Sequence, residues 1–175
     1  MKLICFYGSE SVGKSTMAIR LAKLFRTEFV PEVAREMSLN NDTLTAEDII
    51  RVGEAQTARI LEKKKTANQL LFCDTDLITT QIYSRIYLGV VPPALYELEK
   101  QTAYDRYFFF DIDCPWTDDG MRDLGHRREE VKNMFLEELR KRKIPFIWVR
   151  GNWKEREEII LKELEKLRLI PRHDF

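Results

Sequence analysis

The chain has 175 residues, of which 44% are hydrophobic and 33% charged, and its 29 basic side chains balance its 29 acidic ones. This length and apolar content predict a single α/β domain over residues 1–175 rather than two domains. The zero net charge argues against the basic surface that sequence-independent nucleic-acid binding requires, so we expect no nucleic-acid partner.

The cysteines and the apolar runs indicate the compartment. Cys5, Cys73 and Cys114 are odd in number and far apart, which argues against a disulfide framework or a zinc cluster. No apolar run approaches the roughly 18 residues of a membrane span, and no charged-then-apolar leader precedes the first strand. We therefore expect a cytoplasmic protein with no membrane partner, and the composition favours no particular oligomeric state.

The first strand, loop and helix form a phosphate-binding pattern. Residues 2–7 are an apolar run with strand character, and residues 16–25 are apolar at helical spacing. Between them, Gly8-Ser9-Glu10-Ser11-Val12-Gly13-Lys14-Ser15 has the form G-x-x-x-x-G-K-S, and Thr16 follows it. The two glycines let the backbone curl so that its N–H groups point at a polyphosphate, and the helix adds its positive N-terminal end. We expect Lys14 to reach the β- and γ-phosphates of ATP and Ser15 to bind Mg²⁺.

Strands and helices continue to alternate along the rest of the chain. Apolar runs predict further strands at residues 28–30, 70–73, 107–110 and 145–149. Helical spacing predicts a helix between a capping box at 45–48 and a break at 68–69, and others at 78–88, 94–103, 127–142 and 154–168. The alternation predicts a three-layer α/β sandwich, a five-stranded parallel sheet with right-handed crossovers and helices on both faces. In such a sheet the functional site lies beyond the carboxyl ends of the strands.

Asp74 and Asp76 directly follow the third predicted strand. If that strand lies beside the first one, an acid there is close to the phosphate loop, and we assign Asp74 to Mg²⁺ together with Ser15. Asp76 can then face an acceptor molecule as the catalytic base. The i, i+2 spacing places both carboxylates on one side only if the backbone stays extended. The alternative is that the two acids cap the helix that begins near residue 78.

Glu32 and Arg35 follow the second predicted strand, in a charged stretch, residues 32–36, that we expect to be a loop. A carboxylate there can take a proton from an acceptor hydroxyl, so Glu32 competes with Asp76 for the role of base. Arg35 can clamp an anion or a ribose. The alternative is a surface ion pair among Glu32, Arg35 and Glu36, which contributes little to stability.

Residues 114–128 contain two glycines and three arginines, and we expect them to form a lid. Arg122, with Arg127 or Arg128, would then place positive charge on the transferring phosphoryl group while the lid excludes water. The alternative is a solvated loop before a basic helix start. Trp153 follows the fifth strand, where it either flanks the adenine ring of ATP or packs against a helix.

These motifs resemble the ribosylnicotinamide kinase domain of the bacterial NadR family over roughly residues 1–165. The matching strings are the phosphate loop through Thr16, Glu32 with Arg35-Glu36, D-T-D-x-I-T-T-Q at 74–81, W-x-D-D-G-x-R at 116–122 and Leu124-Gly125. The resemblance implies a P-loop NTPase fold of the nucleotide-kinase type. It also implies phosphorylation of the 5′-hydroxyl of nicotinamide riboside by ATP and Mg²⁺, giving nicotinamide mononucleotide. Longer family members also have a DNA-binding helix-turn-helix and an adenylyltransferase domain. Because this chain begins at the first kinase strand, we expect a stand-alone kinase domain without those two activities.

The sequence is less specific about the acceptor molecule than about the kinase reaction. Pro31 stands where the family has an aromatic side chain suited to stacking on a cationic nicotinamide ring. One alternative is another nucleoside or nucleotide kinase on the same scaffold, and a second is a regulatory ATPase without a small-molecule acceptor. The residues that we expect to contact the substrate are Glu32, Arg35, Asp74, Asp76, Trp116 and Asp119.

Overall fold

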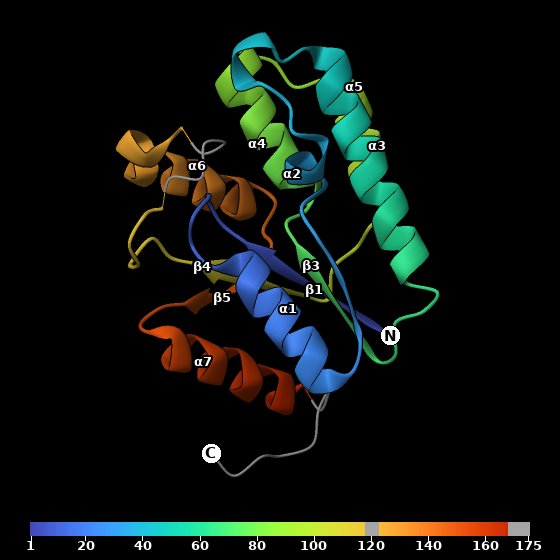
Figure 1. The fold of residues 1–175 in the computed structure, drawn as a ribbon, viewed down its shortest axis with the longest axis vertical. Helices are drawn as coiled ribbons and strands as arrows, with labels where there is room; N and C mark the ends of the chain where they lie inside the picture. The colour runs from blue at the N-terminus through green and yellow to red at the C-terminus, as the bar shows by residue number, and fades with distance from the viewer. Residues whose placement is uncertain (118–122, 168–175) are drawn as a thin grey trace.

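The computed structural model describes residues 1–117 and 123–167, and a five-stranded parallel sheet lies at its centre (Figure 1). The strand order across the sheet is β2-β3-β1-β4-β5. This confirms the predicted sheet. The strands are β1 (Lys2–Tyr7), β2 (Glu28–Val30), β3 (Leu70–Asp74), β4 (Arg106–Phe110) and β5 (Phe146–Val149).

The helices agree with the predicted ones except in three places. They are α1 (Lys14–Phe25), α2 (Val33–Met37), α3 (Ala46–Lys63), α4 (Leu77–Leu88), α5 (Pro93–Glu99), α6 (Arg128–Lys141) and α7 (Trp153–Lys166), with short 3₁₀ turns η1 (Asn41–Thr43) and η2 (Gly125–Arg127).

The first difference is α2, which occupies the charged stretch that we expected to be a loop. This helix has five residues and buries only Val33, so it is too short to show an apolar period in the sequence. The second difference is α3, which ends at Lys63, before the predicted break at 68–69. The third difference is α5, which ends at Glu99, short of the predicted end at residue 103. After it, the amide of Thr102 donates to the carbonyl of Glu99, a tight turn that closes the helix.

The sheet is covered by helices on both faces, as the three-layer prediction requires (Figure 1). Side chains alternate along β1, so Ile4 and Phe6 pack with α1 and α7, whereas Cys5 and Tyr7 pack with α4 and α6. Helix α3 lies on the second of these faces, and α5 packs against α3 and α4. Strands buried on both faces are continuously apolar, which explains the runs that identified them.

The strand order brings the candidate functional residues together. Strand β3 pairs with β1 in a register that places Asp74 opposite Phe6, two residues before the phosphate loop begins at Gly8. Strand β2 pairs with the other edge of β3, so the chain that leaves β2 at Glu32 passes the same end of the sheet. All five strands are parallel, so these carboxyl ends lie on one side of the molecule.

Candidate active site

The phosphate loop is tightly curled between β1 and α1. Gly8 has φ +132°, and a Cβ atom there would lie 2.7 Å from the carbonyl oxygen of Phe110, so no other residue fits. Gly13 has φ +88° and forms the N-cap of α1. The Lys14 Nζ atom donates to the carbonyl oxygens of Gly8 at 3.0 Å and Ser9 at 2.7 Å, which places its charge inside the loop.

The loop borders a pocket, here called the phosphate pocket. Its wall from the loop and the start of α1 runs from Ser11 to Thr16, and Glu32 and Arg35 form the opposite wall. Amides of the curled loop and the N-terminus of α1 both attract anions here. The pocket therefore has the shape and charge of a site for a polyphosphate.

The expected pair of metal ligands meets at the base of the loop. The hydroxyl of Ser15 donates to Oδ2 of Asp74, whose residue is 1% exposed. The other oxygen, Oδ1, is buried and has no hydrogen-bond partner among the described residues. Burial raises the pKa of Asp74, and the neighbouring charge of Lys14 opposes that rise. A buried carboxylate with an unused oxygen beside a serine hydroxyl fits Mg²⁺, which uses one or two protein ligands together with phosphate and water.

The described part of the chain holds no cluster of three or more histidine, cysteine or acidic side chains that could enclose a metal.

The carboxylate of Asp76 lies in a different environment from that of Asp74. Thr75 between them has φ +74°, so the backbone turns and the two carboxylates do not share a side. Asp76 caps α4: its Oδ1 accepts from the Thr79 amide at 2.9 Å, and its Oδ2 accepts from the hydroxyl of Tyr107 at 2.9 Å. Burial raises the pKa of Asp76 to about 6. Of the two alternatives for Asp76, the structure shows the helix cap, and it places this side chain outside the phosphate pocket.

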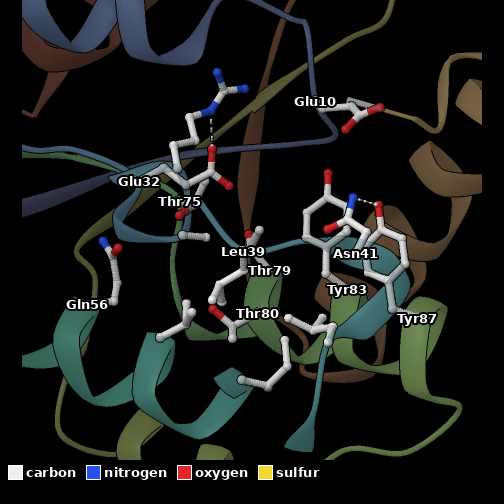
Figure 2. A pocket seen from close by; sticks show the side chains of 15 residues that line it. Glu10, Glu32, Leu39, Asn41, Gln56, Thr75, Thr79, Thr80, Tyr83 and Tyr87 are labelled. Atoms are coloured by element: carbon white, nitrogen blue, oxygen red, sulfur yellow. Dashed lines mark hydrogen bonds and ion pairs between the residues drawn. The ribbon is translucent and has the colours of Figure 1, made fainter. Parts of the chain in front are cut away.

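A second pocket adjoins the phosphate pocket, and we call it the α4 pocket (Figure 2). Leu44, Ile49 and Val52 make part of its wall apolar, and the rings of Tyr83 and Tyr87 from α4 make another part aromatic. These two rings are stacked, with centroids 6.2 Å apart and planes 16° apart.

Glu32 and Arg35 belong to both pockets. The Nε atom of Arg35 donates to Glu32 at 2.8 Å, which is the ion pair that the sequence offered as an alternative. The side chain of Glu32 is 18% exposed, so the pair is more enclosed than an ordinary surface pair. Figure 2 shows Glu32 and Glu10 at different edges of the α4 pocket, with the hydroxyl end of Tyr83 directed to the side where Glu10 lies.

The predicted lid residues that the structure describes lie against the phosphate loop. The amide of Thr117 donates to the Ser11 hydroxyl at 2.7 Å, and Arg128 donates to the carbonyl oxygens of Cys114 at 2.8 Å and Ser11 at 3.5 Å. Trp116 packs so closely on Gly125 that a Cβ atom there would meet its ring at 2.8 Å.

The remaining candidate residues of the lid and of the nucleotide site lie in different places. Arg127 pairs with Glu130 on the first turn of α6, so Arg128 is the one directed at the loop. Asp119 and Arg122 lie outside the described residues. Trp153 begins α7 beside Gly13, where a Cβ atom would meet its ring at 3.1 Å, and it is 39% exposed. This position adjoins the phosphate loop and is compatible with both alternatives for Trp153.

Sequence reasoning missed one buried side chain, on α7, that donates hydrogen bonds to the phosphate loop and its surroundings. Arg156 of α7 is 2% exposed and donates to the carbonyl oxygens of Val12 at 2.8 Å and Gly151 at 2.8 Å. It also pairs with Asp113, which follows β4. Nothing in the sequence distinguishes Arg156 from the other charged residues of its helix, because burial of a helix position depends on what packs against it.

The aromatic wall of the α4 pocket was also missed, although a signal existed. Tyr83 and Tyr87 are four residues apart, which places them on one face of a helix.

Within residues 1–117 and 123–167, the structure contains no helix long and apolar enough to cross a membrane.

Comparison with known proteins agrees with this architecture. A family model described as an AAA domain matches residues 3–156. The trifunctional NAD biosynthesis/regulator protein NadR of Salmonella typhimurium is 31% identical over 159 residues, which is 86% of this chain. The chain spans 38% of the length of that curated relative.

Two solved structures show the same fold. A crystal structure of NadR protein in complex with NR has a TM-score of 0.79 at 24% identity, and the match covers 99% of this chain and 54% of that chain. Thymidylate kinase from Candida albicans has a TM-score of 0.67 at 18% identity, covering 96% of this chain and 92% of that chain. The predicted P-loop nucleotide-kinase fold is thus confirmed. Since the family model spans most of the residues that form the sheet and the phosphate loop, the chain belongs to the AAA domain family. Most of this chain is also similar in sequence to part of NadR.

Proposed function

We propose that the chain is an ATP-dependent kinase that transfers the γ-phosphoryl group to a hydroxyl of a nucleoside-like small molecule. The main support is the junction of the two pockets at Glu32 and Arg35. A polyphosphate held by the loop and a molecule held in the α4 pocket would meet at this carboxylate. Two substrates brought together in this way are what phosphoryl transfer needs, since positioning and charge supply most of its catalysis.

In this proposal the nucleotide is held by the phosphate loop. The loop amides and Lys14 bind the β- and γ-phosphates, and Ser15 and Asp74 hold Mg²⁺, which neutralises phosphate charge when bound. Arg128 lies beside Ser11 of the loop and, with Arg122, would add positive charge at the transferring group.

Glu32 is the base in this mechanism. Asp76 is the weaker candidate because both of its carboxylate oxygens accept hydrogen bonds at the start of α4. Glu32 takes the proton from the acceptor hydroxyl, and the oxygen forms a bond to the γ-phosphorus as the bond to the β,γ-bridging oxygen breaks. ADP leaves with that electron pair. Arg35 keeps Glu32 oriented through their 2.8 Å ion pair.

We further propose nicotinamide riboside as the acceptor, phosphorylated at its 5′-hydroxyl. The similarity to NadR supports this choice, and the solved NadR complex contains NR. The α4 pocket adds physical support: a cationic ring favours an aromatic face, and Tyr83 and Tyr87 supply one although position 31 is proline. The carboxylates of Glu10 and Glu32 at the pocket edge also favour a cation.

The experiment is a single-turnover transfer of labelled phosphate from ATP with Mg²⁺ across a panel of nucleosides and nucleotides. We expect nicotinamide riboside to be phosphorylated fastest. Another preferred acceptor would leave the kinase proposal standing and remove this substrate. If the rate of ATP hydrolysis is the same with and without every acceptor, a regulatory ATPase is favoured instead.

The assignment of the base is tested with Glu32→Gln and a matched control on α2, the helix that begins directly after Glu32. Glu32→Gln should lower kcat by about 10²–10⁴-fold, the usual contribution of a general base, with little change in the KM for ATP. Glu36 lies on α2 outside both pockets and pairs with Arg59, so Glu36→Gln should leave transfer unchanged. Full activity of Glu32→Gln would exclude Glu32 as the base.

A further inference from the structure

Three residues from distant parts of the chain meet at one edge of the α4 pocket. The hydroxyl of Tyr87, near the end of α4, donates to Oδ1 of Asp123 at 2.5 Å. Asn41, on η1, donates from its side-chain amide to the Tyr87 hydroxyl oxygen at 3.2 Å and to Oδ2 of Asp123 at 3.2 Å. Figure 2 shows Asn41 and Tyr87 facing each other at this edge. We call these three residues the clasp.

Asp123 begins a segment, residues 123–128, that continues from the clasp to the phosphate loop. The next residue, Leu124, donates its amide to Oε1 of Glu10 at 3.0 Å, and its side chain is 5% exposed in the core beneath α4 and α6. At the other end of the segment, Arg128 donates to the carbonyl oxygen of Ser11. One short segment thus touches the α4 pocket at Tyr87 and the phosphate loop at two positions.

Tyr87 is suited to join the two sites because its ring and its hydroxyl have different partners. The ring lines the α4 pocket and stacks on Tyr83, whereas the hydroxyl binds Asp123 outside it. Burial and the nearby Asp123 carboxylate both raise the pKa of Tyr87, so the hydroxyl keeps its proton and donates throughout the neutral range. A hydroxyl that donates to a carboxylate at short distance makes one of the stronger hydrogen bonds found in proteins.

We propose that Tyr87 and Asp123 are positioning residues that couple filling of the α4 pocket to the placement of segment 123–128 on the phosphate loop. An acceptor ring packed on Tyr87 restricts the rotation of that side chain and thereby holds its hydroxyl on Asp123. The segment then keeps Leu124 on Glu10 and Arg128 on Ser11. This inference rests on the proposed kinase function, and it adds residues that act through others rather than on the reacting atoms.

The test uses Tyr87→Phe, Asp123→Leu and the double variant. Phenylalanine lacks the hydroxyl that donates and leucine lacks the oxygens that accept, so each single variant breaks the same hydrogen bond while roughly keeping the size of the side chain. The loss of one charge-assisted hydrogen bond should raise the KM for the acceptor about tenfold in each single variant and leave the KM for ATP nearly unchanged. The double variant should be no worse than either single one, because both remove one shared interaction.

A second readout is independent of activity. In the ligand-free protein, hydrogen exchange at the Leu124 amide should speed up about tenfold in both single variants, since this amide depends on the placement of its segment. The matched controls are Tyr96→Phe, on an exposed tyrosine of α5, and Asp42→Leu, on an exposed acid beside Asn41. Both controls lie outside the α4 pocket and should change neither readout.

The outcomes separate the inference from the proposed function. Unchanged Leu124 exchange in Tyr87→Phe, or a double variant whose effect is the product of the two single effects, would overturn the clasp as a coupling device. A wild-type protein that phosphorylates no acceptor of the panel would overturn the proposed kinase function, whatever the exchange rates show.

Discussion

Replacing Asp76 with asparagine separates a structural role for this residue from a catalytic one. Asparagine is as good an N-cap as aspartate, and its side-chain oxygen can still accept from the amide of Thr79 at the start of α4. The hydroxyl of Tyr107 can rotate to accept from the new amide. The substitution therefore removes the titratable group and keeps the shape and the cap.

The magnitude follows from the pKa of Asp76, which burial raises from 3.8 to about 6. At about 1.4 kcal/mol for each pKa unit, this difference is worth about 3 kcal/mol. Because the folded protein binds this proton more tightly than the unfolded chain, the free energy of unfolding falls as the pH rises between about 4 and 6. Asp76→Asn lacks this fall, so its stability relative to the wild type should increase by up to about 3 kcal/mol across that window.

The assay is urea unfolding of both proteins at pH values from 4 to 8, with phosphoryl transfer measured at pH 7.5. The control for loss of one carboxylate is Asp42→Asn on the exposed turn η1. A stability difference that does not change with pH would refute the argument from burial. A fall of kcat by about 100-fold or more, the size expected for a general base, would refute the assignment of Asp76 as a cap alone.

Three further substitutions test the loop and one helix. Lys14→Met should lower kcat by about 10²–10³-fold with an unchanged circular-dichroism spectrum, because it removes the positive charge inside the loop that we propose binds the phosphates; near-normal kcat would contradict this. Gly8→Ala should abolish ATP binding in calorimetry and lower the denaturant midpoint, because its Cβ would lie 2.7 Å from the Phe110 carbonyl oxygen; intact binding would show that the loop can shift. Thr45→Ala should lower the free energy of unfolding by about 1 kcal/mol and leave transfer unchanged, because its side chain accepts from the Asp48 amide in a capping box; an unchanged thermal midpoint would contradict that value.

Several features of this protein follow from short stretches of sequence. The glycine spacing of the phosphate loop requires a curled backbone, and both Gly8 and Gly13 have positive φ. The capping box at Thr45 and Asp48 begins α3 as predicted. The alternation of apolar runs with helical periods predicts the parallel sheet, and the acid after the third strand predicts the contact of Asp74 with Ser15. Each of these features depends on the backbone preference of a few adjacent residues or on the pairing of two neighbouring strands.

Other features depend on contacts between residues far apart in the chain. Asp74 and Asp76 are chemically equivalent in the sequence, and only the left-handed turn at Thr75 directs one to the phosphate loop and the other to Tyr107. The clasp joins residues from η1, α4 and the segment after β4, so no short window of sequence contains it. The sequence by itself determined the fold class and the phosphate loop, because these arise from local patterns. The tertiary structure alone decided which acid contacts Ser15, which acid caps α4 and which residues line the α4 pocket, because packing between distant segments sets the direction of each side chain.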